Sequence, residues 1–170
     1  MRWIWIDRIL ELEKGKRCVA IKNVSLAEDV LHDHFPASDD RPAIPVLPNT
    51  LIIEGMAQTA GILVGHANEF RENVILAKIN KAVFKSAATP GQTLRFEAIL
   101  DRMDIAGAAT TGIVDCIDPA TGQTKPQAEI NLMFSHIDHQ GSDLPLPKYN
   151  FVFSGHFLDL LRQSGIEINP

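Results

Sequence analysis

The longest apolar stretch of the chain, residues 50–65 (TLIIEGMAQTAGILVG), limits the possible folds more than any other feature. Its apolar side chains would cover most of the circumference of a helix, which Asn49 is placed to cap. A helix that is apolar on nearly all sides has to be buried, and an antiparallel sheet is the economical cover for it. Glu54 and Gln58 interrupt the stretch and make it a poor membrane span. We therefore predict a long buried helix and no membrane partner.

The segments on both sides of this helix have the composition of β-strands. Residues 7–13 and 17–24 mix apolar and polar positions around a Lys-Gly-Lys turn. Four further segments are rich in Val, Ile, Phe and Thr and are separated by turn residues: 74–85, 92–103, 107–117 and 124–137. The four prolines of residues 33–48 exclude a helix that runs through that loop. This order predicts an α+β fold, an antiparallel β-sheet wrapped around one long central helix.

The chain is predicted to form one domain with a C-terminal extension. Its 170 residues are enough for one buried core, which residues 1–138 would supply. Residues 139–170 read as a linker and a short amphipathic helix, with Ser154 as its cap and Gly165 at its end. Because such a short helix is unstable alone, we expect it to dock on its own sheet or on a neighbouring subunit. The alternative is a cap over the mouth of a binding slot.

Charge and cysteine content restrict the partners and the compartment. The formal net charge of −5 gives no basic field for a phosphate backbone, so nucleic acid is not an expected partner. Cys18 and Cys116 lie far apart in apolar contexts, without metal-ligand or redox spacing. The opening residues MRWIWIDRIL are cut by an aspartate and do not read as a signal peptide. We therefore expect free core thiols and a cytoplasmic location.

Glu54 is the one charged residue of the apolar stretch. An exposed or structurally paired glutamate is the ordinary explanation of such a position, because a buried unpaired carboxylate is costly. Its neighbours favour a catalytic role. Gln58 lies one helical turn later, and the helix start at Asn49 and Thr50 offers free N–H groups to an oxygen that gains negative charge. His34, on the preceding loop, has the side chain best suited to proton abstraction near neutral pH.

Three segments also resemble a known family: HDHFPA, PVLPNTLIIEGMAQ and KINKAVFKSAATPGQTLRFEA. They are similar to the FabZ-like beta-hydroxyacyl-acyl-carrier-protein dehydratases of type II fatty-acid synthesis, a hotdog-fold family, over about residues 7–137. By position, the resemblance implies that His34 and Glu54 are the catalytic residues. It also implies that the backbone amide at Asn49 polarises the thioester carbonyl and that Gln58 is the family's helix glutamine.

The resemblance implies a reaction and its partners. Water would leave a (3R)-hydroxyacyl thioester on acyl carrier protein, or on coenzyme A, to give a trans-2-enoyl thioester. His34 would take the C2 proton, and Glu54, kept protonated by apolar surroundings, would give one to the departing hydroxyl. The family needs no metal or organic cofactor. Its members share each site between two subunits, so a homodimer is expected, and a trimer of dimers is the larger assembly that we considered.

The sequence departs from the family pattern in three places. Ala37 replaces the first glycine and Asn49 the helix-start glycine, although asparagine tolerates positive φ. Six extra residues, SDDRPA at positions 38–43, separate the two proline elements of the loop, and their polar composition favours an outward bulge. The segment FKSAATPG lacks a second basic residue beside its lysine, which weakens the expectation of carrier-protein docking.

Other functions remain open at this point. In a hotdog thioesterase Glu54 would activate water without His34, and a non-catalytic acyl-thioester-binding subunit would have lost catalysis through the long loop. His32 and His34 alternate like neighbours on one face of a strand and, with Asp33 between them, suggest a metal site, but no third ligand appears at a useful spacing. Four side chains are candidates for an acyl slot, with simple core packing as the alternative: Phe84, Phe96, Met103 and Phe134.

Overall fold

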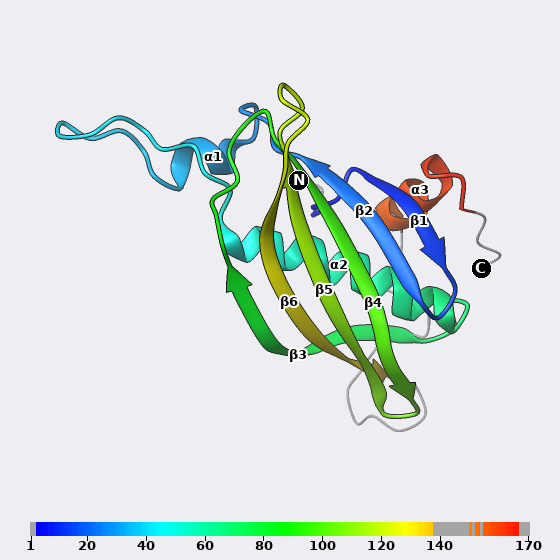
Figure 1. Ribbon diagram of the computed structural model, residues 1–170. Helices are drawn as coiled ribbons and strands as arrows, with labels where there is room; N and C mark the ends of the chain where they lie inside the picture. Colours follow the sequence, from blue (N-terminus) through cyan, green and yellow to red (C-terminus); the bar gives the residue numbers. More distant parts are fainter. Residues whose placement is uncertain (1–2, 138–149, 151, 154, 167–170) are drawn as a thin grey trace.

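A computed structural model describes residues 3–137, 150, 152–153 and 155–166 of the chain. Six strands form one antiparallel sheet in the order β1-β2-β4-β5-β6-β3 (Figure 1). The strands are β1 (Arg8–Glu13), β2 (Arg17–Asn23), β3 (Asn73–Phe84), β4 (Thr93–Asp104), β5 (Gly107–Ile117) and β6 (Thr124–Ile137). The helices are α1 (Asp29–Asp33), α2 (Asn49–Ala67) and α3 (His156–Gln163). The predicted α+β arrangement is confirmed, and α1 is an addition to it.

The sheet curves around α2, which forms the centre of the fold (Figure 1). Ile52, Met56 and Leu63 of this helix are fully buried. Burying one such side chain stabilises the fold by about 1.5–3 kcal/mol. The three together therefore contribute much more to the free energy of unfolding than an ordinary surface substitution changes it. Gly55 lets the helix approach the sheet, because a Cβ there would lie 2.7 Å from the ring of Phe96. The apolar stretch is therefore buried, as its composition requires.

The start of α2 differs from the sequence expectation. Asn49 is the first residue of the helix, Pro48 holds the cap position, and the cap makes no side-chain hydrogen bond. The carbonyl of Pro48 accepts the N–H groups of Leu51 and Ile52 at 2.9 and 3.3 Å. The prediction that the Asn49 side chain caps the helix is wrong, because the fixed proline conformation already sets the entry into the first turn. Among the described residues, Glu69 and Phe70 are the non-glycine residues with positive φ, so Asn49 has no need of its tolerance for that region.

Strand β3 forms one edge of the sheet and is exposed along most of its length. It pairs with β6 on one side and leaves its other side open. Leu76 and Ile79 stand opposite Phe134 and Leu132, so they share the face of the sheet that carries the core. Yet 36% of Leu76 and 45% of Ile79 is accessible. An open edge strand with apolar residues is a typical place for a second chain to pair.

The described part of the tail packs on the sheet. Leu160 and Leu161 of α3 are buried, and the Ile9 N–H of β1 donates to Oγ of Ser164 at 3.0 Å. Gly165, with φ of 78°, ends the helix as predicted. The predicted cap residue, Ser154, lies outside the described residues. In this structure the tail therefore docks on its own sheet.

The two cysteines are free and buried, as expected. Burial raises the pKa of the Cys18 thiol to about 12. Burial, followed by the nearby Asp118 carboxylate, also raises the pKa of Cys116. Both thiols are thus unreactive at neutral pH. No helix in the described part of the chain has the length and apolar character needed to cross a membrane.

Candidate active site

His34 follows directly after α1, and its backbone N–H donates to the carbonyl of Val30 at 3.1 Å. This bond ends the short helix at the histidine and fixes where its side chain begins. The imidazole lies 4.3 Å from the ring of Phe35, measured between centroids, and the residue is exposed. His34 lines a pocket of about 600 Å3 together with the start of α2, including Asn49 and Thr50.

The first turn of α2 presents polar hydrogens to this pocket. Among the described residues, neither the Asn49 nor the Thr50 N–H has a hydrogen-bond partner, as is usual at a helix start. The positive end of the helix dipole adds to their attraction for a negatively charged oxygen. The structure therefore places His34 in one pocket with the N-terminus of α2 and its two free N–H groups.

Glu54 lies one and a half turns further along α2, about 7.5 Å along the helix axis from Asn49. Two donors meet at one of its oxygens. Nε2 of Gln58 donates to Oε1 of Glu54 at 2.8 Å, and the indole Nε1 of Trp3 donates to the same oxygen at 3.1 Å. A protonated carboxyl group has one accepting and one hydroxyl oxygen. Because Oε1 accepts both bonds, the proton of a neutral Glu54 would sit on Oε2.

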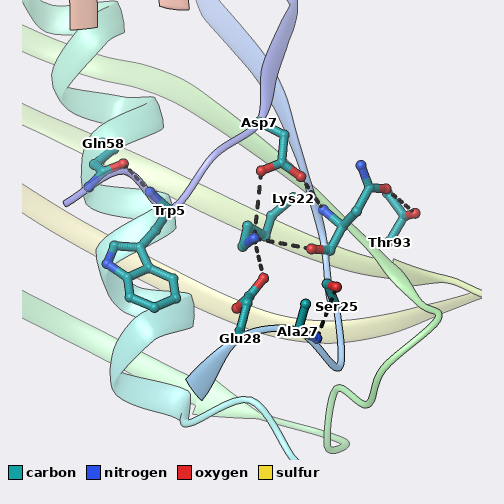
Figure 2. A network of polar contacts seen from close by, with 9 residues as sticks. Trp5, Asp7, Lys22, Ser25, Ala27, Glu28, Gln58 and Thr93 are labelled. Carbon is teal, nitrogen blue, oxygen red and sulfur yellow. Dashed lines mark hydrogen bonds and ion pairs between the residues drawn. The ribbon is translucent and has the colours of Figure 1, made fainter. Parts of the chain in front are cut away.

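Gln58 connects this carboxyl group to the N-terminal segment. Its Oε1 accepts the backbone N–H of Trp5 at 2.8 Å, and its Nε2 also donates to the carbonyl of Trp3 at 3.2 Å. The side chain is nearly buried, so its amide orientation is fixed by three partners at once. Figure 2 shows the bond between Gln58 and Trp5 where the N-terminal segment passes α2.

A lysine network holds the same N-terminal segment from its other side (Figure 2). Nζ of Lys22 contacts Glu28 at 2.6 Å, the Asn23 carbonyl at 3.1 Å and Asp7 at 3.6 Å. Asp7 also accepts the Asn23 N–H at 2.6 Å. Lys22 is 8% exposed and joins the N-terminal segment, through Asp7, to the segment before α1, through Glu28. It stabilises the position from which Trp3 and Trp5 reach α2.

The tryptophans are site residues that the sequence prediction missed. The only available signal was the segment RWIWID, which contains both tryptophans of the chain two positions apart in an extended pattern. In an extended segment, residues two apart point to the same side. Here the indole of Trp3 bonds Glu54, whereas Trp5 bonds Gln58 through its backbone N–H.

In the part of the chain that the structure describes, His34 and Glu54 line different pockets. Glu54 and Gln58 line a smaller pocket of about 180 Å3, which is separate from the pocket of His34. Asn49 and Thr50 belong with His34, and Gln58 belongs with Glu54. Glu54 is also partly exposed, and its surroundings are more polar than we expected from the sequence.

The inserted residues 38–43 bulge away from the body of the protein, as their composition predicted. The cyan segment between α1 and α2 extends outward in Figure 1. Ser38 and Arg41 form a small antiparallel bridge, and the guanidinium of Arg41 lies 5.7 Å from the Phe35 ring centroid. The Ile44 N–H donates to the Phe35 carbonyl at 3.0 Å and closes the base of the bulge.

Of the four residues predicted to line an acyl slot, two line pockets and two belong to the core. Phe134 lines the pocket of Glu54, whereas Phe84 lines the pocket of His34. Phe96 is 1% exposed and Met103 packs against the core, so these two are core residues. In the described part of the chain, no three His, Cys, Asp or Glu side chains gather in a metal-binding group. His32 instead contacts the Leu26 carbonyl through Nε2 at 2.7 Å.

Comparison with known proteins finds a matching family model and relatives named FabZ. Residues 3–124 match the family model described as the FabA-like domain. The 3-hydroxyacyl-acyl-carrier-protein dehydratase FabZ of Geotalea uraniireducens is 37% identical over 138 residues, which cover 78% of this chain and 87% of that protein. FabZ of Caldanaerobacter subterraneus subsp. tengcongensis is 38% identical over 112 residues, 65% of this chain and 75% of that protein.

Solved structures agree in fold at lower sequence identity. The dehydratase heterocomplex ApeI:P from Xenorhabdus doucetiae superposes with a TM-score of 0.56 at 19% identity, over 80% of this chain and 84% of that chain. An acyl-CoA hydrolase from Staphylococcus aureus, in complex with butyryl coenzyme A, gives 0.58 at 13% identity, over 74% and 68%. These likenesses show the hotdog fold. Together with the match over residues 3–124, they show that the chain belongs to the FabA-like family and is a FabZ-like hotdog dehydratase.

Proposed function

We propose that the protein eliminates water from (3R)-hydroxyacyl thioesters in type II fatty-acid synthesis, with His34 as the base and Glu54 as the acid. One observation carries the assignment of roles. The carboxyl group of Glu54 is held through Oε1 by Gln58 and Trp3, which leaves Oε2 to carry and deliver a proton. His34, in contrast, has its imidazole in an open pocket beside the start of α2.

Each step of the elimination has a group to perform it. Neutral His34 removes the C2 proton, and the C2–H electrons move toward the thioester oxygen. The Asn49 and Thr50 N–H groups and the helix dipole stabilise the negative charge that develops there. The electrons then form the C2=C3 bond as the C3–O bond breaks, and the Glu54 proton leaves with the hydroxyl as water. The proton on His34 returns to Glu54 through solvent before the next cycle.

A complete site would need two chains. Because His34 and Glu54 line separate pockets in one chain, we propose a homodimer in which His34 of one protomer works with Glu54 of its partner. The open edge of β3, with exposed Leu76 and Ile79, is the surface best suited to that contact.

The carrier and the compartment are further parts of the proposal. The FabZ relatives are named for acyl-carrier-protein substrates, which favours acyl carrier protein over coenzyme A. Two free buried thiols suit a reducing compartment, so we propose the cytoplasm. We also propose that residues 1–138 form the dehydratase domain and residues 139–170 an appended segment.

Two substitutions test the catalytic roles. His34→Ala and Glu54→Gln should each lower the turnover of a 3-hydroxyacyl thioester by at least ~100-fold, as expected for loss of a general base or acid. His32→Ala is the matched control, since it removes an exposed histidine from the same short segment. Formation of the enoyl thioester is followed by absorbance, and circular dichroism checks folding. Near-normal turnover in either variant would overturn the assignment, and thioester hydrolysis that persists in His34→Ala would favour a thioesterase.

A further inference from the structure

We propose that Val152, Phe153 and Phe157 of the tail form the closed end of the acyl-binding slot and limit the length of the acyl chain. The inference deepens the proposed dehydratase function and rests on it. These three side chains lie beyond residues 3–124, the part of the chain that matches the family model. The length limit would therefore be a property of this chain's own tail.

The slot begins at the proposed acid. The pocket beside Glu54 is walled by α2, β3, β6 and the tail, and its lining residues are Glu54, Ala57, Gln58, Gly61, Val74, Leu76, Phe134, Val152, Phe153 and Phe157. Glu54 and Gln58 are the polar members: Glu54 begins the helical series, and Gln58 lies one turn further along and is hydrogen-bonded to it. From Glu54 to Gly61 the pocket follows α2 for about 10 Å. An apolar channel that starts at a proton donor suits an acyl chain bonded to the reacting carbons.

Phe153 closes the far end of this channel. It lies against Gly65, one turn of α2 beyond Gly61, where an added Cβ would be only 2.6 Å from its ring. Its ring centroid lies 4.9 Å from that of Phe70 and 6.3 Å from that of Phe157. Phe153 is 6% exposed. The aromatic cluster therefore blocks continuation of the channel along the helix.

Hydrogen bonds fix the tail in this position. Nδ2 of Asn150 donates to the carbonyls of Phe70 and Glu72, both at 3.0 Å. Oδ1 of Asn150 accepts the N–H groups of Val152 and Phe153 at 3.1 and 3.0 Å. The first two bonds join the tail to the turn after α2, and the other two order the tail itself around Asn150. Because the buried leucines of α3 hold the tail further on, the closed end has support on both sides.

The size of the pocket indicates which acyl-chain lengths it would accept. Its volume of about 180 Å3 is below the range of roughly 300–1,000 Å3 that is usual for ligand pockets. Short acyl chains should fit, and longer ones should meet Phe153 and Phe157. A slot residue that is made smaller should admit longer chains, and one that is made larger should exclude them.

The test uses 3-hydroxybutyryl, 3-hydroxyhexanoyl, 3-hydroxyoctanoyl and 3-hydroxydecanoyl pantetheine thioesters. We chose Val152 and Phe157 because both are partly exposed, whereas truncation of buried Phe153 would endanger the fold. Phe157→Ala and Val152→Ala should raise the decanoyl-to-butyryl ratio of kcat/KM by at least ~10-fold, the smaller end of the effect expected when a hydrophobic pocket gains or loses a methylene. Val152→Phe should lower it.

Leu158→Ala is the matched control. Leu158 is partly buried on the same helix and does not line the slot, so its truncation should leave the ratio unchanged. An unchanged ratio in folded Phe157→Ala and Val152→Phe would overturn the inference. Calorimetric affinities for the same thioesters report the length preference without turnover. A variant-dependent shift in affinity without any dehydration would contradict the proposed function alone, whereas dehydration with an unshifted preference would contradict the slot alone.

Discussion

The indole N–H of Trp3 donates to Oε1 of Glu54 across 51 residues of sequence, at 3.1 Å. Gln58, from the next turn of the same helix, donates to that oxygen at 2.8 Å. The bond from Gln58 holds the carboxyl group along α2, and the bond from Trp3 ties it to the N-terminal segment. In the proposed mechanism Trp3 is therefore a positioning residue, which would act on the substrate through Glu54.

Trp3→Phe should lower kcat by about fivefold and leave KM nearly unchanged. The substitution keeps an aromatic ring but removes a hydrogen bond worth ~1 kcal/mol, at a side chain that is half exposed. Steady-state kinetics would measure the effect, because a misplaced acid lowers kcat, whereas a lost substrate contact would raise KM.

Trp5→Phe provides the matched control for this prediction. Among the described residues the Trp5 indole nitrogen is buried without a partner, and its bond to Gln58 runs through the backbone, which phenylalanine retains. Its kcat should therefore stay near that of the wild type. Equal effects of the two substitutions would show that Trp3 acts by packing and not through its N–H group.

Periodicity was enough to predict the fold. The apolar residues of α2 surround the helix, and the six strand segments agree with the structure to within about two residues at each end, the usual uncertainty of such boundaries. The N-terminus of α2 could not be predicted as well. Asn49 and Pro48 are both acceptable at a helix start, and only the path of the preceding loop decides which one holds the cap position.

The site was predictable only in its local part. Glu54 and Gln58 are four residues apart on one helix, so their contact follows from helical geometry. The contacts of Trp3 and Trp5 join segments more than 50 residues apart and depend on how the N-terminal segment crosses the sheet. The separation of His34 from Glu54 depends in turn on the path of residues 35–48, which no helical or strand period describes.

Mixing two inactive variants should restore activity if each site is shared between chains. A heterodimer of His34→Ala and Glu54→Gln protomers contains one site with both defects and one site with neither. Random exchange makes half of the dimers mixed, so about a quarter of the wild-type turnover should return. The measurement is turnover after mild dissociation and reassociation, with exchange followed by mass spectrometry of differently tagged chains. Exchange without recovery would show that the site is built within one chain.

Removal of residues 38–43 should leave a folded and active enzyme. The bulge is exposed, and the hydrogen bond from Ile44 to the Phe35 carbonyl already holds its two ends together. Because loop-closure free energy changes slowly with length, the free energy of unfolding should change by less than ~1 kcal/mol.

Turnover should also survive the deletion. His34 lies before the closing bond, in the turn anchored to Val30, so its position does not depend on the bulge. Turnover should therefore stay within about threefold, which corresponds to a change of less than ~1 kcal/mol in the barrier. Urea unfolding and steady-state turnover would measure the two effects. A loss of turnover that a length-matched Gly-Ser replacement also shows would instead assign a role to the side chains Asp39, Asp40 and Arg41.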